Sequence, residues 1–133
     1  SGNPLFAALF VGSVATAAAD TLASEIGVIA GEPYLITDFS RVPPGTNGGV
    51  TVLGETVAFF GALILSLLAC IMGVIPMAFV AAVTAGGFLG TNIDSVIGAV
   101  FENRGVIGNA GTNFVATAGG GLCALLLSLP VAG

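Results

Sequence analysis

Four long stretches that carry almost no charged side chains limit what this chain can fold into. They cover residues 4–29, 50–72, 77–101 and 106–129. Each is as long as the roughly 20 apolar residues that carry a helix across a bilayer. Prolines and glycines separate them, most clearly in the loop 31–49, with its Pro43–Pro44 pair, and in the turn 73–76. The sequence therefore predicts an all-α fold, a polytopic transmembrane helix bundle with about four spanning helices.

Composition supports a membrane protein and excludes several function classes. Charged residues make up 7% of the 133 residues, whereas a soluble domain carries about 25%. The net charge is −5, so the chain lacks the basic surface that nucleic-acid binding requires. No histidine is present, and we expect Cys70 and Cys123, which lie in apolar stretches, to be buried free thiols rather than zinc ligands. We expect residues 1–133 to form a single integral membrane domain embedded in the lipid bilayer.

The order of the helices brings two connections to one face of the membrane. Successive spanning helices cross in opposite directions, so the first and the third end at the same face. The loop 31–49 and the connection 102–105 then share that face, together with the two basic residues, Arg41 and Arg104. The positive-inside rule makes it the cytoplasmic face, or the stromal face of a plastid membrane.

The charged residues gather near that face in two clusters. Six lie from Asp20 to Glu55, and the other three are Asp94, Glu102 and Arg104. Ionisable side chains are costly inside a membrane and usually mark a site. Because Asp20 and Asp94 lie near the same-side ends of two helices, we expect the clusters to form one polar pocket. The simpler alternative is that each Asp only hydrogen-bonds to neighbouring Ser, Thr or Asn residues and holds helices together.

The remaining acidic residues are weaker candidates. Glu25 lies about 140° from Asp20 around a helix at 100° per residue, so these two carboxylates do not face one ion without a kink. Glu55 lies in the first turns of the second helix. We expect Glu32, Asp38 and Glu102 to be solvated loop charges.

Small and polar residues at i+4 spacing indicate how the helices pack. One such line on the third helix comprises Gly86, Gly90, Asp94 and Gly98. Small residues let helix backbones approach closely in lipid. Asn109 and Asn113 begin a similar line on the fourth helix, and we expect them to hydrogen-bond between helices rather than reach a nucleotide.

The glycine-rich stretch Gly45-Thr46-Asn47-Gly48-Gly49 runs directly into the second apolar stretch. Glycines permit positive φ angles that turn successive amides inward, and a helix N-terminus adds positive potential. Together they favour an anion, most simply a phosphate. The alternative is a glycine-rich helix start in which Thr46 or Asn47 is the N-cap and nothing is bound.

Charged groups beside this loop extend the phosphate hypothesis. Arg41 can add bidentate contacts to phosphate oxygens. Mg²⁺ is typically held by one or two carboxylates together with substrate phosphates, which makes Asp20 and Asp94 the expected metal ligands, with Glu25 a weaker third. The residues themselves predict a membrane-embedded site for a phosphorylated ligand and a divalent metal, and the hydrophobic walls suggest a lipidic co-substrate.

These motifs resemble those of one known family. The residues that carry the resemblance read ADTLASEIG, RVPPGTNGGVTVLG, GTNIDSVIGAVFENRGVIGN and NFVATAGGG. They are similar to the family catalogued as domain of unknown function 92, which includes transmembrane protein 19, over a match from about Pro4 to Leu126. Plant members of that family are phytyl-phosphate kinases of tocopherol and phylloquinone metabolism. More distantly, the arrangement is similar to dolichol kinases and CDP-lipid synthases, which use cytidine nucleotides.

The resemblance implies a function. It implies a magnesium-dependent kinase that passes a phosphoryl group from CTP or another NTP to an isoprenoid monophosphate, in a plastid membrane or a prokaryotic cytoplasmic membrane. Family members are usually longer, with further transmembrane segments upstream. This chain would then be the C-terminal part of such an architecture, with other membrane subunits or segments supplying the missing helices.

The resemblance also implies a set of site residues. The positions that match the family's motifs are Asp20, Ser24, Glu25, Arg41, Pro44, Gly45, Thr46, Gly48, Gly49, Asp94 and Ser95. On this basis we expect Asp20, Arg41 and Asp94 to be catalytic. The residues expected to bind the nucleotide or phosphate are Ser24, Arg41, Gly45, Thr46, Asn47, Gly48 and Gly49.

Three other functions fit the same residues. A cytidylyltransferase that makes a CDP-lipid would use the same carboxylates and release pyrophosphate. A non-catalytic membrane subunit of a larger complex would fit the short length. A transporter would also place carboxylates inside the membrane, although the phosphate-type loop argues against it.

Overall fold

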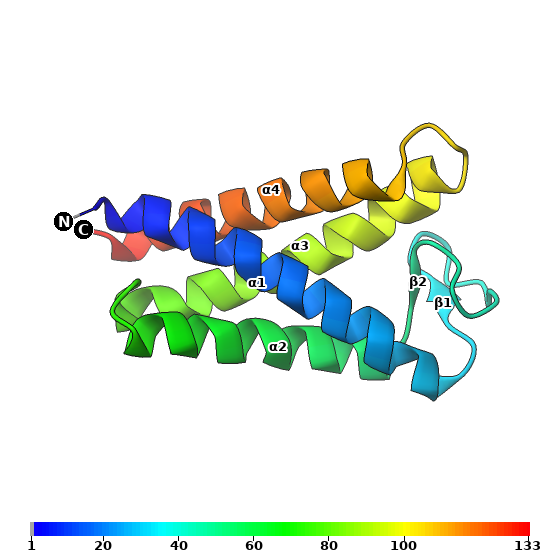
Figure 1. The fold of residues 1–133 in the computed structure, drawn as a ribbon, viewed down its shortest axis with the longest axis horizontal. Coiled ribbons are helices and arrows are strands. Elements are labelled where there is room, and N and C mark those ends of the chain that lie inside the picture. The colour runs from blue at the N-terminus through cyan, green and yellow to red at the C-terminus, as the bar shows by residue number, and fades with distance from the viewer. Residues whose placement is uncertain (1) are drawn as a thin grey trace.

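A computed structural model describes residues 2–133 as four long helices that run up and down beside one another (Figure 1). The helices are α1 (Pro4–Gly27), α2 (Val52–Ile71), α3 (Val80–Ile97) and α4 (Asn109–Ser128). Single short turns flank them: η1 (Val28–Ala30), η2 (Met77–Phe79), a π-helical turn η3 (Gly98–Glu102) and η4 (Leu129–Val131). All four long helices are long and apolar enough to cross a membrane, which confirms the predicted fold class.

The loop between α1 and α2 contains a small hairpin that the sequence did not predict. Strand β1 (Tyr34–Leu35) pairs antiparallel with β2 (Gly49–Val50). Thr51 is the extended N-cap residue of α2, and its hydroxyl accepts a hydrogen bond from the Gly54 amide at 2.9 Å. The alternative in which Thr46 or Asn47 is the N-cap was therefore wrong about the cap, because Gly49 and Val50 pair with β1 as a strand and the helix starts only after Thr51.

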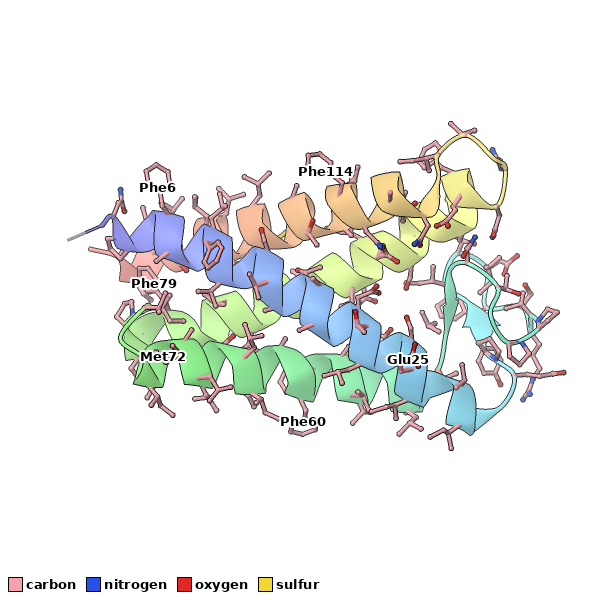
Figure 2. All side chains as sticks on the ribbon, viewed as in Figure 1. Phe6, Glu25, Phe60, Met72, Phe79 and Phe114 are labelled. Carbon is pink, nitrogen blue, oxygen red and sulfur yellow. The ribbon has the colours of Figure 1, made fainter. Side chains whose placement is uncertain are left out.

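Small side chains fill the interior of the bundle and large ones cover its outside. The buried residues include Ala8, Ala15, Ala19, Ala58, Ala62, Ala116 and Ala124. Phe60 on α2 and Phe114 on α4, which project from the bundle in Figure 2, are 53% and 73% exposed. Helices in lipid gain little from burying large apolar side chains and associate through close packing of small ones, so this inverted arrangement suits a bilayer.

The closest packing joins α1, α3 and α4 near the middle of the bundle. Thr16 on α1 is fully buried, and its side chain contacts the positions where Gly90 and Gly120 would carry a Cβ. A Cβ on Gly86 would lie 2.6 Å from the backbone nitrogen of Ala124. The predicted close approach at Gly86 and Gly90 is confirmed, because only glycine leaves room for the neighbouring helices.

The hairpin and the connection between α3 and α4 lie at the same end of the bundle, and both termini lie at the other end (Figure 1). The third helix ends close to the expected residue 101, because the π-helical turn carries it through Glu102, whereas α4 begins at Asn109 rather than at residue 106. Arg41 and Arg104 belong to these two connections and so share one end, as the sequence predicted. Which compartment that end faces stays a prediction.

The packing of α3 on α4 predicts that Gly86→Ala destabilises the bundle. The added methyl group would meet backbone rather than a flexible side chain, and such overpacking typically costs about 1–3 kcal/mol. Gly108→Ala is the matched control, since Gly108 has a negative φ and nothing within 4 Å of its Cβ position. Thermal unfolding of the two variants in detergent should show a lower midpoint for Gly86→Ala, and equal midpoints would contradict the packing described here.

Candidate functional site

A polar cavity of about 390 Å³ lies at the hairpin end of the bundle, between the helices and the hairpin. All four long helices and the loop 31–51 contribute to its wall. The predicted site residues that line it are Asp20, Ser24, Glu25, Gly45, Thr46, Asn47, Gly49 and Asp94. Most of the predicted site residues therefore line this cavity, and two of them, Arg41 and Gly48, are placed elsewhere.

Helix register brings Asp20 and Asp94 to the same cavity. Asp20 lies four residues beyond Thr16 on α1, and Asp94 lies four residues beyond Gly90 on α3. Both helices run toward the hairpin (Figure 1), so the contact between Thr16 and Gly90 sets both carboxylates one turn nearer to it. The two residues also share the wall of a second, smaller cavity. The predicted convergence of these two acids is thus what the fold produces.

Asp94 is only partly satisfied by the protein. In the part of the chain that the structure describes, its Oδ1 atom is buried and has no hydrogen-bond partner. The alternative in which Asp94 serves only to hydrogen-bond helices together does not account for this atom. A buried acceptor without a partner is costly, and a bound cation or ligand donor would offset that cost.

Glu102 is a cavity residue that sequence reasoning missed. It was expected to be a solvated loop charge, but the π-helical turn carries α3 one turn further and places Glu102 in the wall. Such π-helical turns occur frequently at functional sites. The signal in the sequence was the continued i+4 spacing Asp94-Gly98-Glu102, which reads through the expected helix end.

Asp38 shows the contrasting behaviour of a solvated loop charge. Its Oδ1 accepts hydrogen bonds from the amide and hydroxyl of Ser40, at 2.9 and 2.6 Å. The hydroxyl and then the amide hydrogen bond hold the pKa of Asp38 below its usual value. Asp38 is exposed and does not line the cavity, as expected from the sequence.

The glycine-rich loop presents unused backbone donors to the cavity. Gly45 and Gly48 have φ angles of +86° and +82°, which confirms the predicted need for glycine at these positions. The amides of Thr46 and Gly49 donate within the loop, to the carbonyls of Pro43 and Thr46. Within residues 2–133, the amides of Gly45, Asn47 and Gly48 have no backbone acceptor, and of these three residues Gly45 and Asn47 line the cavity.

Gly48 positions the loop rather than lining the cavity. A Cβ at Gly48 would lie 2.6 Å from the Ser95 carbonyl oxygen and would also strike Ala99, and one at Gly98 would lie 3.2 Å from the Gly48 nitrogen. The side-chain amide of Asn103 donates to the Asn47 carbonyl at 2.9 Å. The loop is therefore fastened to the end of α3, beside Asp94.

Arg41 lies outside the cavity wall. One guanidinium nitrogen donates to the Tyr34 hydroxyl at 2.9 Å, and the guanidinium carbon lies 5.0 Å from the centre of the Tyr34 ring. A second nitrogen lies 3.9 Å from Glu32, in an ion pair whose side chains are 63% and 62% exposed. A role for Arg41 on a phosphate stays a prediction, and it requires the side chain to leave Tyr34 and Glu32.

Four other polar residues, whose roles the sequence left open, line the cavity. Glu25 lines the cavity despite its 140° separation from Asp20, because the cavity spreads over more than one face of α1. Glu55 also lines it, and its carboxylate accepts a hydrogen bond at 3.2 Å from Asn92 of α3. Asn109 and Asn113 line the cavity, which favours the ligand contact that the sequence reasoning ranked second.

The donor set suits a metal only with help from a ligand. Among the described residues, no group of three or more His, Cys, Asp or Glu side chains is arranged to hold a metal ion. Asp20 and Asp94 give two carboxylates on one cavity, and the unpaired Oδ1 of Asp94 is a free oxygen donor. Mg²⁺ commonly takes one or two carboxylates together with substrate phosphates and water, so the residues present fit that ion.

These features define a class: an integral membrane protein whose helices enclose a polar site at one face. Residues 1–122 match the family described as Integral membrane protein DUF92. The chain belongs to this family.

Relatives of this chain occur in archaea, cyanobacteria and plants. The chain is 38% identical over 120 residues to an uncharacterized membrane protein of Methanocaldococcus jannaschii, covering 89% of this chain and 50% of that protein. It is 38% identical over 96 residues to an uncharacterized membrane protein of Synechocystis, covering 71% and 37%. It is 32% identical over 103 residues to the chloroplastic protein VTE6 of Arabidopsis thaliana, covering 77% and 31%. The chain thus spans half or less of the length of these relatives. No solved structure matches it.

The fastening of the loop predicts different effects for two glycine substitutions. Gly45→Ala and Gly48→Ala both place a side chain at positive φ, but only Gly48→Ala also drives a methyl group into α3, since nothing lies within 4 Å of the Gly45 Cβ position. Gly48→Ala should release the loop, and amide hydrogen exchange over residues 43–50 should become faster than in Gly45→Ala. Equal exchange in the two variants would show that the loop does not depend on this contact.

Proposed function

We propose that this chain forms the phosphoryl-transfer site of a membrane-embedded phosphotransferase. The reaction passes the terminal phosphoryl group of CTP or another NTP to an isoprenoid monophosphate of the phytyl type, and the products are the isoprenoid diphosphate and the nucleoside diphosphate. The place of this activity would be a prokaryotic cytoplasmic membrane or a plastid membrane, consistent with relatives in archaea and cyanobacteria and with the chloroplastic VTE6.

One observation carries the proposal: two carboxylates from spanning helices and the free amides of a glycine-rich loop share one open cavity at a membrane face. Phosphoryl transfer requires mainly that phosphates be positioned and their charge offset. An acceptor that is already a phosphate needs no strong general base, which fits a site in a chain without lysine or histidine. The resemblance to phytyl-phosphate kinases supplies the substrate class.

The protein groups have separate roles in this proposal. The amides of Gly45 and Asn47 bind phosphate oxygens, and Asn109, Asn113 and Ser24 bind the nucleotide or orient the acceptor phosphate. Arg41 adds a further phosphate contact after it leaves the hairpin surface. The ion pair with Glu32 opposes this movement little, since a pair this exposed is worth about 0–1 kcal/mol, and the contacts of Arg41 with Tyr34 must also break.

Asp20 and Asp94, with Glu25 at their edge, are the groups that would hold Mg²⁺. When bound, the ion neutralises negative charge on the nucleotide phosphates. The carboxylates keep their positions through the packing of Thr16 against Gly90, and Asn92 holds Glu55 in the adjoining wall. The protein thus provides fixed oxygen donors on rigid helices.

Two other functions remain candidates on specific grounds. A cytidylyltransferase that makes a CDP-lipid would use the same cavity, and it would release pyrophosphate instead of a nucleoside diphosphate. A non-catalytic membrane subunit is the other candidate, because among the described residues no group of three or more His, Cys, Asp or Glu side chains is arranged to hold a metal ion. Further segments or subunits of the membrane complex would then complete the site.

Asp20→Asn and Asp94→Asn should abolish phosphoryl transfer. The assay is conversion of phytyl or geranylgeranyl phosphate by the full-length protein in proteoliposomes, with CTP and Mg²⁺. Removal of one charge-stabilising group commonly lowers turnover by about a hundredfold or more. Arg41→Ala should raise the KM for CTP. The matched control is Asp38→Asn, because Asp38 is equally acidic but exposed and outside the cavity.

Product analysis separates the candidates. Release of CDP supports the kinase, and release of pyrophosphate supports the cytidylyltransferase. Wild-type rates in both Asp20→Asn and Asp94→Asn would overturn the proposed roles. Absence of both turnover and nucleotide binding in the full-length protein, purified in a stable stoichiometric complex, would favour the non-catalytic subunit.

A further inference from the structure

A second cavity continues from the carboxylates between α1 and α4. It has a volume of about 90 Å³, and Asp20, Thr21, Asp94 and Asn113 belong to the walls of both cavities. The other residues of its wall are Thr16, Ala17, Ala116 and Thr117. The two cavities therefore meet at the two carboxylates, with the glycine-rich loop on one side and the α1–α4 cleft on the other.

The second cavity leads away from the hairpin, toward the middle of the bundle. Thr16 lies four residues before Asp20 on a helix that runs toward the hairpin, which places it about 6 Å deeper at 1.5 Å per residue. Ala116 and Thr117 lie beyond Asn113 on α4, which runs away from the hairpin (Figure 1). A ligand that follows this cavity from the carboxylates enters the region where the outer surface of the bundle is apolar.

The cleft is open on its outer side. Ala17, Thr21 and Asn113 are exposed although they line the cavity. The closing contacts of α1 with α4 lie further from the hairpin, where Gly12 meets Ala124 and Gly121 meets Ser13. From that contact the two helices spread apart toward the hairpin in the view of Figure 1. The open side faces outward between spanning helices, where lipid would surround the protein.

We propose that the α1–α4 cleft binds the first part of the prenyl chain, with the substrate phosphate beside Asn113 at the junction of the two cavities and the rest of the chain in the bilayer. This inference rests on the proposed function for the identity of the ligand. The water-soluble nucleotide would enter from the hairpin side, and the lipid substrate would enter sideways from the membrane. The wall of the second cavity suits entry of the lipid from the membrane, since its alanine and threonine side chains leave space for a hydrocarbon chain beside the carboxylates where the two cavities meet.

Photolabelling tests the cleft without depending on turnover. The probe is a prenyl phosphate with a diazirine near its phosphate end, applied to the full-length protein in lipid nanodiscs. Adducts should form within residues 16–21 and 112–117. Thr117→Phe should reduce this labelling, because it fills the cleft, whereas Val115→Phe should not, because Val115 is 40% exposed and outside both cavities. Valine and threonine are nearly the same size, so the two substitutions add similar bulk.

Kinetics give a second readout in the same variants. Thr117→Phe should raise the KM for a long-chain prenyl phosphate by about tenfold, in the range expected for a blocked apolar subsite, and leave the KM for CTP unchanged. Ala17→Phe fills the cleft from α1, and it repeats the test if Thr117→Phe does not fold. Labelling confined to other helices, or equal labelling in the cleft-filling variants and Val115→Phe, would overturn the inference.

The outcomes distinguish this inference from the proposed function. If the cleft is labelled and Thr117→Phe reduces that labelling, but the protein transfers no phosphoryl group, prenyl binding in the cleft stands and the proposed kinase function is rejected. If the protein transfers phosphoryl groups, but neither Thr117→Phe nor Ala17→Phe changes the labelling or the KM for the prenyl phosphate, the proposed kinase function stands and prenyl binding in the cleft is rejected.

Discussion

The contact of Thr16 with Gly90 and Gly120 fixes the geometry on which the rest of the structure depends. It joins three helices at a distance that a Cβ on either glycine would prevent. Since α1 and α3 run in the same direction, this contact sets their relative height, and the next turn of each helix carries Asp20 or Asp94. A site of this kind inside a membrane requires rigid placement, because a carboxylate that turned toward lipid would leave the polar cavity at a high cost.

The close packing of small residues also explains why one end of the bundle is closed and apolar while the hairpin end is open and polar. At the end away from the hairpin, α1 and α4 close on each other through Gly12, Gly121 and Ala124, and the core there is apolar. At the hairpin end the helices separate, and acidic residues with asparagines occupy the space. Hydroxyl groups elsewhere in the bundle, such as those of Ser66 and Ser128, donate to carbonyls of their own helix and require no partner across the interface.

The sequence predicted the features that depend on periodicity and missed those that depend on local backbone geometry. The scarcity of charges and the lengths of the apolar stretches were sufficient to predict four helices. The alternating directions of those helices were sufficient to predict that Asp20 and Asp94 lie at the same end. The position of Arg41 could not be predicted, because it follows from an isolated antiparallel bridge between Tyr34 and Arg41 that sets the guanidinium against Tyr34. Glu102 was missed because a π-helical turn extends α3 across what looked like a polar connection.

Thiol cross-linking between positions 20 and 94 tests the central geometry most directly. In the full-length protein with Cys70 and Cys123 replaced by alanine, the paired variant Asp20→Cys and Asp94→Cys should be joined by a short bifunctional thiol reagent, and both positions should react with a water-soluble thiol reagent from the hairpin side. A pair formed from Asp20→Cys and Val115→Cys should not be joined. Reaction of positions 20 and 94 from opposite sides of the membrane, without cross-linking, would contradict a shared site.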